Sequence, residues 1–200
     1  MPFQKYAAEL LGTCTLTLLV SLSLTSEFPL ATAIVAGLVL CLFVYTIGPI
    51  SGAHINPAVT VALASIQKIS PMDAIGYVVS QVLGALLAMW VAKNYGSGFL
   101  PTVLVSNTAR VGLAEAMGAF ALVFGVSAVV HGKVHSAASG LTIGGSLLIG
   151  ILIASVAGNG VANPAVAIGI GSVSPMYLLG PLAGGLAAAW VYKFLVEAKG

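Results

Sequence analysis

The tetrapeptide Asn-Pro-Ala-Val occurs twice in the chain, at Asn56–Val59 and at Asn163–Val166. Asn is a favoured N-cap because its side-chain oxygen accepts hydrogen bonds from the first turn, and Pro is favoured at the first helical position. The Asn amide group can still donate to an uncharged molecule, whereas the positive end of the helix dipole repels cations. We therefore predict a site for neutral molecules, formed by Asn56, Pro57, Ala58, Asn163, Pro164 and Ala165.

Two carboxylates, Glu9 and Glu115, stand in stretches that are otherwise apolar and uncharged. A carboxylate inside an apolar span is costly, so it is a functional candidate. In a secondary transporter such a pair would serve as a proton relay.

The composition explains why these apolar stretches matter. Of the 200 residues, 59% are hydrophobic and 6% are charged, whereas soluble domains have about 45–50% apolar and about 25% charged residues. A folded chain cannot hide so much apolar surface, so its solvent must include lipid. This excludes a cytosolic enzyme, a disordered chain, a coiled coil and a disulfide-rich secreted module. Cys14 and Cys41 lie in apolar stretches, and we expect them to be small core residues rather than metal ligands.

Other chemistries are not indicated. The formal net charge is +2 and no run of Lys or Arg is present, so we expect no nucleic-acid partner. The sequence shows no nucleophile–base pair, metal-ligand cluster or phosphate-binding loop. We therefore expect neither an enzyme nor a cofactor or metal site.

Long uncharged runs define the expected helices. A spanning helix needs about 20 apolar residues, and Gly, Pro and Asn at 47–56 and 157–164 interrupt the two longest runs. The first run resembles a signal peptide, but it contains Glu9 and lacks a clear cleavage site, so we expect it to be retained. We predict an all-α membrane protein with spans at 6–25, 31–48, 72–93, 109–131, 139–157 and 175–195. Two shorter helices, Pro57–Gln67 and Pro164–Gly171, would reach only halfway across.

Basic residues in the short connections predict the orientation, because Lys and Arg collect on the cytoplasmic side. One side would carry Lys5, Lys68, Lys133, Lys193 and Lys199, and the other Lys93 and Arg110. We therefore expect both termini to be cytoplasmic.

The two halves of the chain repeat each other. The sequence AELLG at 8–12 returns as AEAMG at 114–118, and GALLAMWVAK at 84–93 returns as GGLAAAWVYK at 184–193. Each half holds three spans, so the second half enters the membrane inverted, and such repeats place the substrate path between the halves near the midplane. We predict one channel domain over 1–200, with repeats of about 1–100 and 101–200. Small residues at Gly140, Gly144, Gly180 and Gly184 would let helices approach closely.

The segments SGAHINPAVT (51–60) and GNGVANPAV (158–166) resemble the paired loops of the aquaporin and glycerol-facilitator family, the major intrinsic proteins. AELLG, Gln81, Glu115 and LGPLAGGLAAA also resemble that family, and the likeness extends from Lys5 to Lys193. It implies six tilted helices and two half-helices around one pore, usually in a homotetramer. It also implies passive passage of water or small uncharged solutes through a plasma membrane or a bacterial or archaeal inner membrane.

The resemblance also assigns roles to single residues. Glu9 and Glu115 would brace the half-helix loops by accepting hydrogen bonds, and Gln81 would join helices. His54 would border the cytoplasmic vestibule, although a packing role is equally compatible with the sequence.

One position departs from the family pattern. Family members usually carry Arg directly after the second Asn-Pro-Ala, where this chain has Val166. The other positions of the outer constriction match Ala36, Ile151 and Gly160. This set contains no aromatic residue, His or charge, so it predicts a wide, apolar selectivity constriction that admits solutes such as glycerol, urea or ammonia.

Two other functions are compatible with the membrane fold. A secondary transporter of a small solute would need coupling-ion sites, for which only Glu9 and Glu115 are available. A poorly conducting structural or junctional protein would not need Asn56 and Asn163, which both motifs retain.

Overall fold

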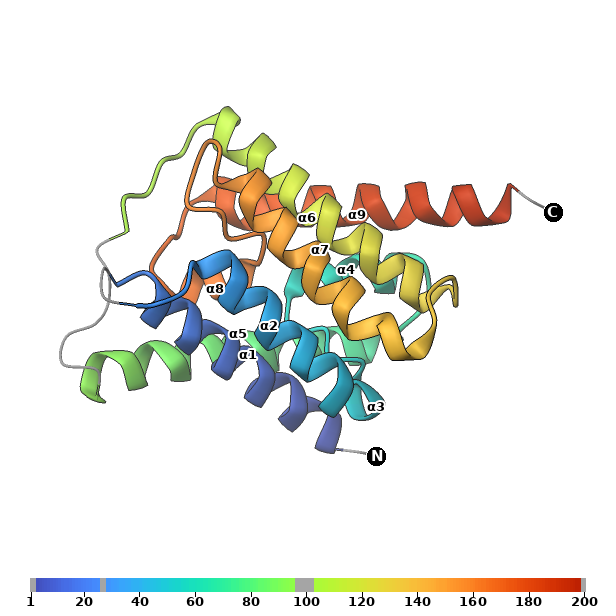
Figure 1. Cartoon of the computed structure of the whole chain (residues 1–200), viewed down its shortest axis with the longest axis horizontal. Helices are drawn as coiled ribbons and strands as arrows, with labels where there is room; N and C mark the ends of the chain where they lie inside the picture. Colours follow the sequence, from blue (N-terminus) through green and yellow to red (C-terminus); the bar gives the residue numbers. More distant parts are fainter. Residues whose placement is uncertain (1–2, 26–27, 96–102, 199–200) are drawn as a thin grey trace.

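The computed structural model describes residues 3–25, 28–95 and 103–198, and within them every regular element is a helix. Figure 1 shows the long helices packed side by side in a bundle. The predicted all-α fold is confirmed. The elements are α1 (Phe3–Ser23), α2 (Thr32–Thr46), α3 (Gly48–Ser51), α4 (Pro57–Ser65), α5 (Pro71–Tyr95), α6 (Ala109–Val130), the 3₁₀ helix η1 (Ser136–Ala138), α7 (Ser139–Ala154), α8 (Pro164–Gly169) and α9 (Pro175–Glu197).

Five segments are long and apolar enough to cross a membrane: α1, α5, α6, η1 with α7, and α9. The sixth predicted span, 31–48, is shorter than expected, because α2 has 15 residues and ends at Thr46. Pro49 explains the break: proline cannot donate a backbone hydrogen bond, and it disfavours helical backbone in the residue before it. The chain turns there and restarts as α3.

The two repeats meet at glycines. Gly37 of α2 and Gly144 of α7 are 107 residues apart, the same spacing as the two Asn-Pro-Ala motifs. A Cβ atom on Gly37 would lie 2.8 Å from the carbonyl oxygen of Gly144, and one on Gly144 would collide with the carbonyl oxygen of Gly37. Equivalent residues thus contact each other, which places a pseudo-two-fold axis between these helices.

The predicted close approaches of helix backbones are found at Gly144, Gly180 and Gly184, whereas Gly140 packs against the ring of Tyr45. Gly84 of α5 packs on the backbone of Leu10, and its repeat partner Gly184 of α9 packs on Ala116. Contacts of this kind let helices associate in lipid, where the hydrophobic effect does not drive them together. Gly140, Gly144 and Gly180 likewise have no room for a side chain.

The two cysteines are less buried than predicted. Cys14 and Cys41 are free thiols of intermediate exposure rather than fully buried core residues. Both lie where helices cross at glycine, Cys14 beside Gly84 and Cys41 beside Gly144. They therefore pack against neighbouring helices while remaining partly at the surface.

The half-helices α4 and α8 are shorter than predicted because each ends in a left-handed residue. Gln67 has φ of 62° and Gly171 has φ of 79°. In each case the next residue donates back to the helix, Lys68 to the carbonyl of Leu63 and Ser172 to that of Ala167. This is the Schellman termination, which stops a helix by satisfying its last carbonyls.

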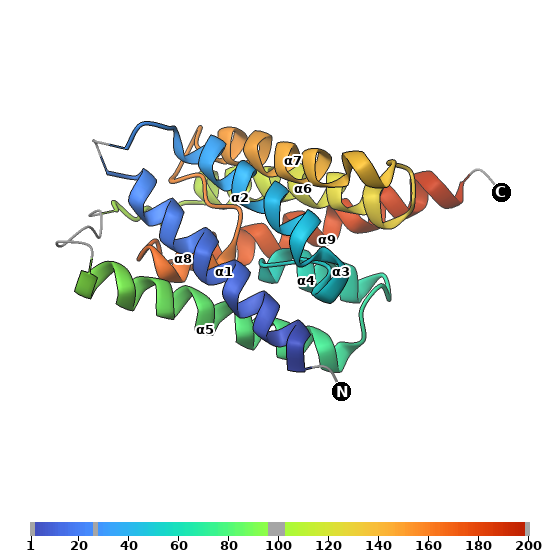
Figure 2. The same cartoon turned by 60° about the horizontal axis from the view of Figure 1, so that its bottom comes forward.

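Each half-helix packs against the other repeat. α4 contacts α9, and α8 contacts α5 and α1. Figure 2 shows both inside the bundle, with the N- and C-termini towards the same end of the molecule. Lys199, used for the predicted orientation, and the repeat boundary near residue 101 lie outside the described residues.

Candidate functional site

Asn56 and Asn163 cap the two half-helices. The Oδ1 atom of Asn56 accepts a hydrogen bond from the Ala58 amide at 2.8 Å, and that of Asn163 accepts from the Ala165 amide at 3.0 Å. Both Asn residues have extended backbones, and Pro57 and Pro164 occupy the first helical turn. The predicted helix starts are therefore confirmed.

The same two side chains also cross the repeat interface. Asn56 Nδ2 donates to the Ala162 carbonyl at 2.9 Å, and Asn163 Nδ2 donates to the Ile55 carbonyl at 3.0 Å. An amide group carries two hydrogens, so each Asn keeps one donor for another partner. Sequence reasoning missed these reciprocal bonds, which bring the two helix starts together.

Ala58 and Ala165 follow the prolines and have no exposed surface. The Ala58 carbonyl lies directly against Gly185 of α9, where a Cβ atom would approach it within 3.0 Å. The first Asn-Pro-Ala motif thus packs closely against the backbone of α9.

The loops before the motifs contain unusual backbone. Ala53, Ile55 and Ala162 have positive φ angles of 50°, 39° and 50°, in the left-handed region that costs residues with a side chain about 1–3 kcal/mol each. Such conformations persist only where surrounding contacts hold them. Two buried carboxylates make those contacts.

Glu9 receives hydrogen bonds from both backbone and side chains. Its Oε1 accepts from the His54 amide at 2.9 Å and the Ser51 hydroxyl at 2.7 Å, and its Oε2 accepts from the Ile55 amide at 2.6 Å. Gln81 Nε2 donates to Oε2 at 2.8 Å. Glu9 has no exposed surface, and these donors replace the water that the carboxylate lost.

Glu115 makes the equivalent contacts with fewer groups. Its carboxylate accepts from the Val161 amide at 3.0 Å and the Ala162 amide at 2.6 Å. Tyrosines at equivalent positions of α5 and α9 bond the loops as well. Tyr77 Oη donates to the Ser51 carbonyl at 2.7 Å, and Tyr177 Oη accepts from the Asn159 amide at 2.9 Å.

Gln81 joins three helices, because its Nε2 also donates to the Thr60 hydroxyl of α4 at 2.9 Å. His54 packs against its neighbours, as one of the two alternatives expects, and its place in a cytoplasmic vestibule stays a prediction. Its Nδ1 lies 3.1 Å from Thr60 Oγ1 and its ring packs edge-on against Tyr77. It also lines an inner cavity of about 320 Å³ between α2, α4, α6 and α7.

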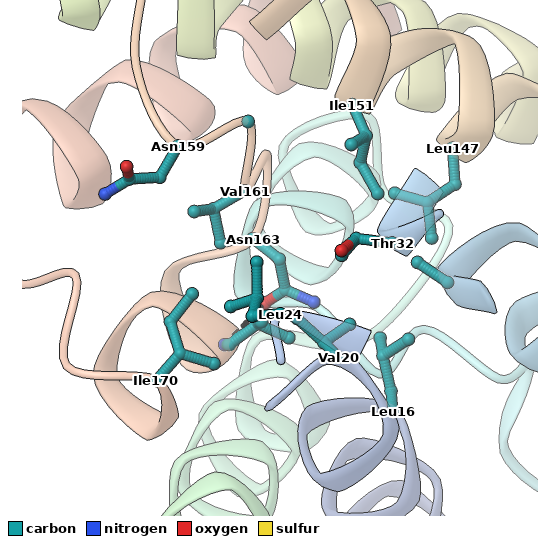
Figure 3. Close-up of a pocket in the computed structure, with 13 residues that line it drawn as sticks. Leu16, Val20, Leu24, Thr32, Leu147, Ile151, Asn159, Val161, Asn163 and Ile170 are labelled. Carbon is teal, nitrogen blue, oxygen red and sulfur yellow. Dashed lines mark hydrogen bonds between the residues drawn. The ribbon is translucent and has the colours of Figure 1, made fainter. Parts of the chain in front are cut away.

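The four predicted constriction residues lie together. Ala36, Ile151, Gly160 and Val166 line one outer cavity, which Asn163 also borders. Figure 3 shows Asn163 near the centre of this cavity, with Ile151 and Leu147 on one side and Leu16 and Val20 on another. Among the residues that the structure describes, no Lys, Arg, Asp or Glu lines either cavity.

The cavity at these four residues is small, and the width of the constriction stays a prediction. The outer cavity has a volume of about 20 Å³, which is enough for about one water molecule. Side chains outside the four positions occupy the space that Ala36 and Gly160 leave. These additional apolar residues, which sequence reasoning missed, are Leu16, Val20, Leu24, Leu147 and Ile170.

A family model for the major intrinsic proteins matches residues 2–192. Nodulin-26 from Glycine max is 34% identical and is matched over 98% of this chain and 79% of its own length. The glycerol uptake facilitator protein-like 6 of Lactiplantibacillus plantarum is 33% identical over 97% of this chain and 92% of its own. The aquaglyceroporin from Plasmodium falciparum has the same fold, with a TM-score of 0.67 and 21% identity over 96% of this chain and 94% of that one.

Proposed function

The chain belongs to the major intrinsic protein family, and from this premise we propose that its pore conducts water and small uncharged solutes, such as glycerol, passively across a membrane. The observation that carries the proposal is the pair of Asn side chains. Each caps one half-helix, bonds the opposite loop and keeps one N–H donor. Asn163 borders the outer cavity directly.

Neutral molecules are favoured at this point for an electrostatic reason. The N-terminus of a helix carries a partial positive charge of about +0.5, and here two such ends meet. A cation entering between them finds no carboxylate on either cavity wall within the described residues. A molecule with a lone pair accepts from an Asn and passes, because pore selectivity follows from donors and electrostatic barriers of this kind.

Glu9 and Glu115 act in this proposal as braces rather than proton carriers. Both oxygens of each carboxylate already accept hydrogen bonds from the adjacent loop. The loop backbone is held at positive φ angles next to these bonds. Loss of a brace would therefore release the loop and displace the Asn at its end.

The remaining site residues line either the outer or the inner cavity. Ala36, Ile151, Gly160 and Val166 form an apolar selectivity constriction on the outer side, and His54 borders the cytoplasmic vestibule. The orientation rests on Lys5 and Lys193, near the ends of α1 and α9, and on Lys68 and Lys133 in the connections between helices.

The protein is a multi-pass membrane protein. We further propose that both termini face the cytoplasm, that it resides in a plasma membrane or a bacterial or archaeal inner membrane, and that it forms a homotetramer. Its relatives are channels, and the proposal includes no catalysis and no cofactor.

Stopped-flow light scattering of proteoliposomes tests the proposal. Vesicles that contain the protein should respond to a sucrose gradient faster than empty vesicles, and should take up glycerol downhill. The flux should stay the same when proton and sodium gradients are imposed or removed. Flux that requires an ion gradient would indicate a secondary transporter, and permeability equal to that of empty vesicles would indicate a structural protein.

A further inference from the structure

One wall of the outer cavity comes from α1. Leu16 and Val20 are spaced by four residues, so they lie on the same face of that helix, and Leu24, directly after its end, donates its amide to the Val20 carbonyl at 3.2 Å. Leu16 is 2% exposed and Val20 is 6% exposed, while Leu24 at the end of the stripe is 37% exposed. All three line the cavity that Asn163 borders, and Figure 3 shows Leu16 and Val20 extending from α1 towards it.

Two of the four positions matched to the family constriction add little bulk to this cavity, so its narrowness depends on the larger side chains around them. Ala36 contributes a single methyl group, and Gly160 contributes none. A side chain at Gly160 has no room, because its Cβ atom would lie 2.8 Å from the Ile151 carbonyl oxygen and would collide with the Ser155 hydroxyl. The cavity of about 20 Å³ is therefore bounded by Ile151 and Val166 together with larger side chains from other elements, among them Leu16 and Val20.

The α1 stripe also determines the chemistry of the wall. Leucine and valine offer no hydrogen bond, and a permeant beside them can bond only to polar groups elsewhere on the cavity wall, such as Thr32, Asn159 and Asn163. A polar group that loses a hydrogen bond to water without a replacement is penalised in an apolar passage. A polyol with several hydroxyl groups loses more such bonds than water or ammonia does.

We propose that Leu16 and Val20 of α1 are the side chains that limit the size of the permeant, with Leu24 extending the same wall outwards. The inference rests on the proposed channel function and adds the determinant of its solute range. The pore passes molecules of about the size of water or ammonia most readily, and larger polyols pass more slowly because the α1 wall must move aside. The four matched residues, Ala36, Ile151, Gly160 and Val166, then define the position of the constriction, and the α1 side chains define its width.

Truncation of the wall tests the inference. In Leu16→Ala and Val20→Ala the ratio of glycerol to water permeability should rise roughly tenfold or more, since a hydrophobic pocket discriminates by that factor per methylene. Leu11→Ala is the matched control, because Leu11 lies on the same helix, is 56% exposed and is not among the residues that line the cavity. Its ratio should equal that of the wild type.

A second variant separates the effect of the wall's side-chain size from that of its polarity, without creating a cavity. Val20→Thr keeps nearly the same shape and adds one hydroxyl to the wall. Water permeability should then increase while the ratio of glycerol to water does not rise. A Val20→Thr protein with unchanged permeability to both would show that the permeant does not touch this wall.

The outcomes distinguish this inference from the channel proposal. If the wild type conducts water and both alanine variants keep its glycerol-to-water ratio, α1 does not limit solute size and the inference is wrong. If the wild type conducts neither water nor glycerol above empty vesicles, the channel proposal itself fails. If an alanine variant does not reconstitute, Val20→Thr still decides whether the wall contacts the permeant.

Discussion

The two re-entrant loops share one backbone plan but differ in the side chains around them. In each, a buried glutamate accepts loop amides and an Asn starts a half-helix. At equivalent positions, however, the first repeat has polar residues where the second has apolar ones. The pairs are His54 and Val161, Thr60 and Ala167, and Gln81 and Pro181.

The two loops border different cavities, the inner one at His54 and the outer one at Asn163. The polar network of the first loop, which links Glu9, Gln81, Thr60 and His54, ends at an inner cavity of about 320 Å³. The second loop borders an outer cavity of about 20 Å³ with a mainly apolar lining. The comparison teaches that the repeated backbone creates the Asn pair, while the unrepeated side chains make the two cavities differ in volume; both linings are mainly apolar.

The largest expected effect concerns the two braces. Glu9→Ala would leave the His54 and Ile55 amides, the Ser51 hydroxyl and Gln81 without their partner, at about 1–3 kcal/mol for each orphaned group. Glu115→Ala orphans only the Val161 and Ala162 amides. Glu9→Ala should therefore lower the unfolding temperature in detergent more than Glu115→Ala does. Equal losses would mean that the side-chain donors of the first loop add nothing.

The next effect concerns the Asn residue that starts the half-helix in each loop. Asn163→Asp places a carboxylate at the meeting point of two positive helix ends, so sodium or potassium flux into liposomes should rise clearly above that of the wild type. Asn56→Asp should act alike, because the two Asn residues make equivalent bonds. No added cation flux in either variant would argue against helix-end repulsion as the barrier.

A smaller effect is expected when the outer mouth is made polar. Val166→Arg introduces a long side chain with five donors into the apolar cavity. Glycerol and urea permeability should fall much more than water permeability in stopped-flow measurements, because the guanidinium occupies space and orders water. Val166→Leu adds bulk without donors and serves as the control. Equal losses of water and glycerol in the Arg variant would contradict selective narrowing.

The smallest effect concerns the inner mouth. His54→Val gives the first loop the residue that the second loop has at Val161. It removes the contact with Thr60, worth about 0.5–1.5 kcal/mol, from a cavity that is already large. Water permeability should fall about twofold or less, with the glycerol-to-water ratio unchanged. A strong change in that ratio would place selectivity at the inner mouth and overturn the comparison.

Much of the architecture could be predicted from local patterns. The Asn-Pro pairs marked the starts of α4 and α8 to the residue, because capping depends on neighbours along the chain. The ends of the same helices were less predictable, because Gln67 terminates α4 in a left-handed conformation that its residue type does not indicate. The end of α2 was predicted two residues too late, and the short helix α3 inside the predicted interruption at 47–56 was missed, although Pro49 was the available indication.

The sequence by itself determined that the chain is a membrane protein and that its two halves are inverted repeats. It also determined that the N-termini of two half-helices meet between the repeats. These conclusions follow from composition, spacing and chain-local capping. Only the tertiary structure decided the bonds of Asn56 to Ala162 and of Asn163 to Ile55, which join residues more than 100 positions apart. It alone also decided the width of the outer cavity. Periodicity predicts that Leu16, Val20 and Leu24 share a face, but cavity volume depends on how far that face lies from the opposite wall.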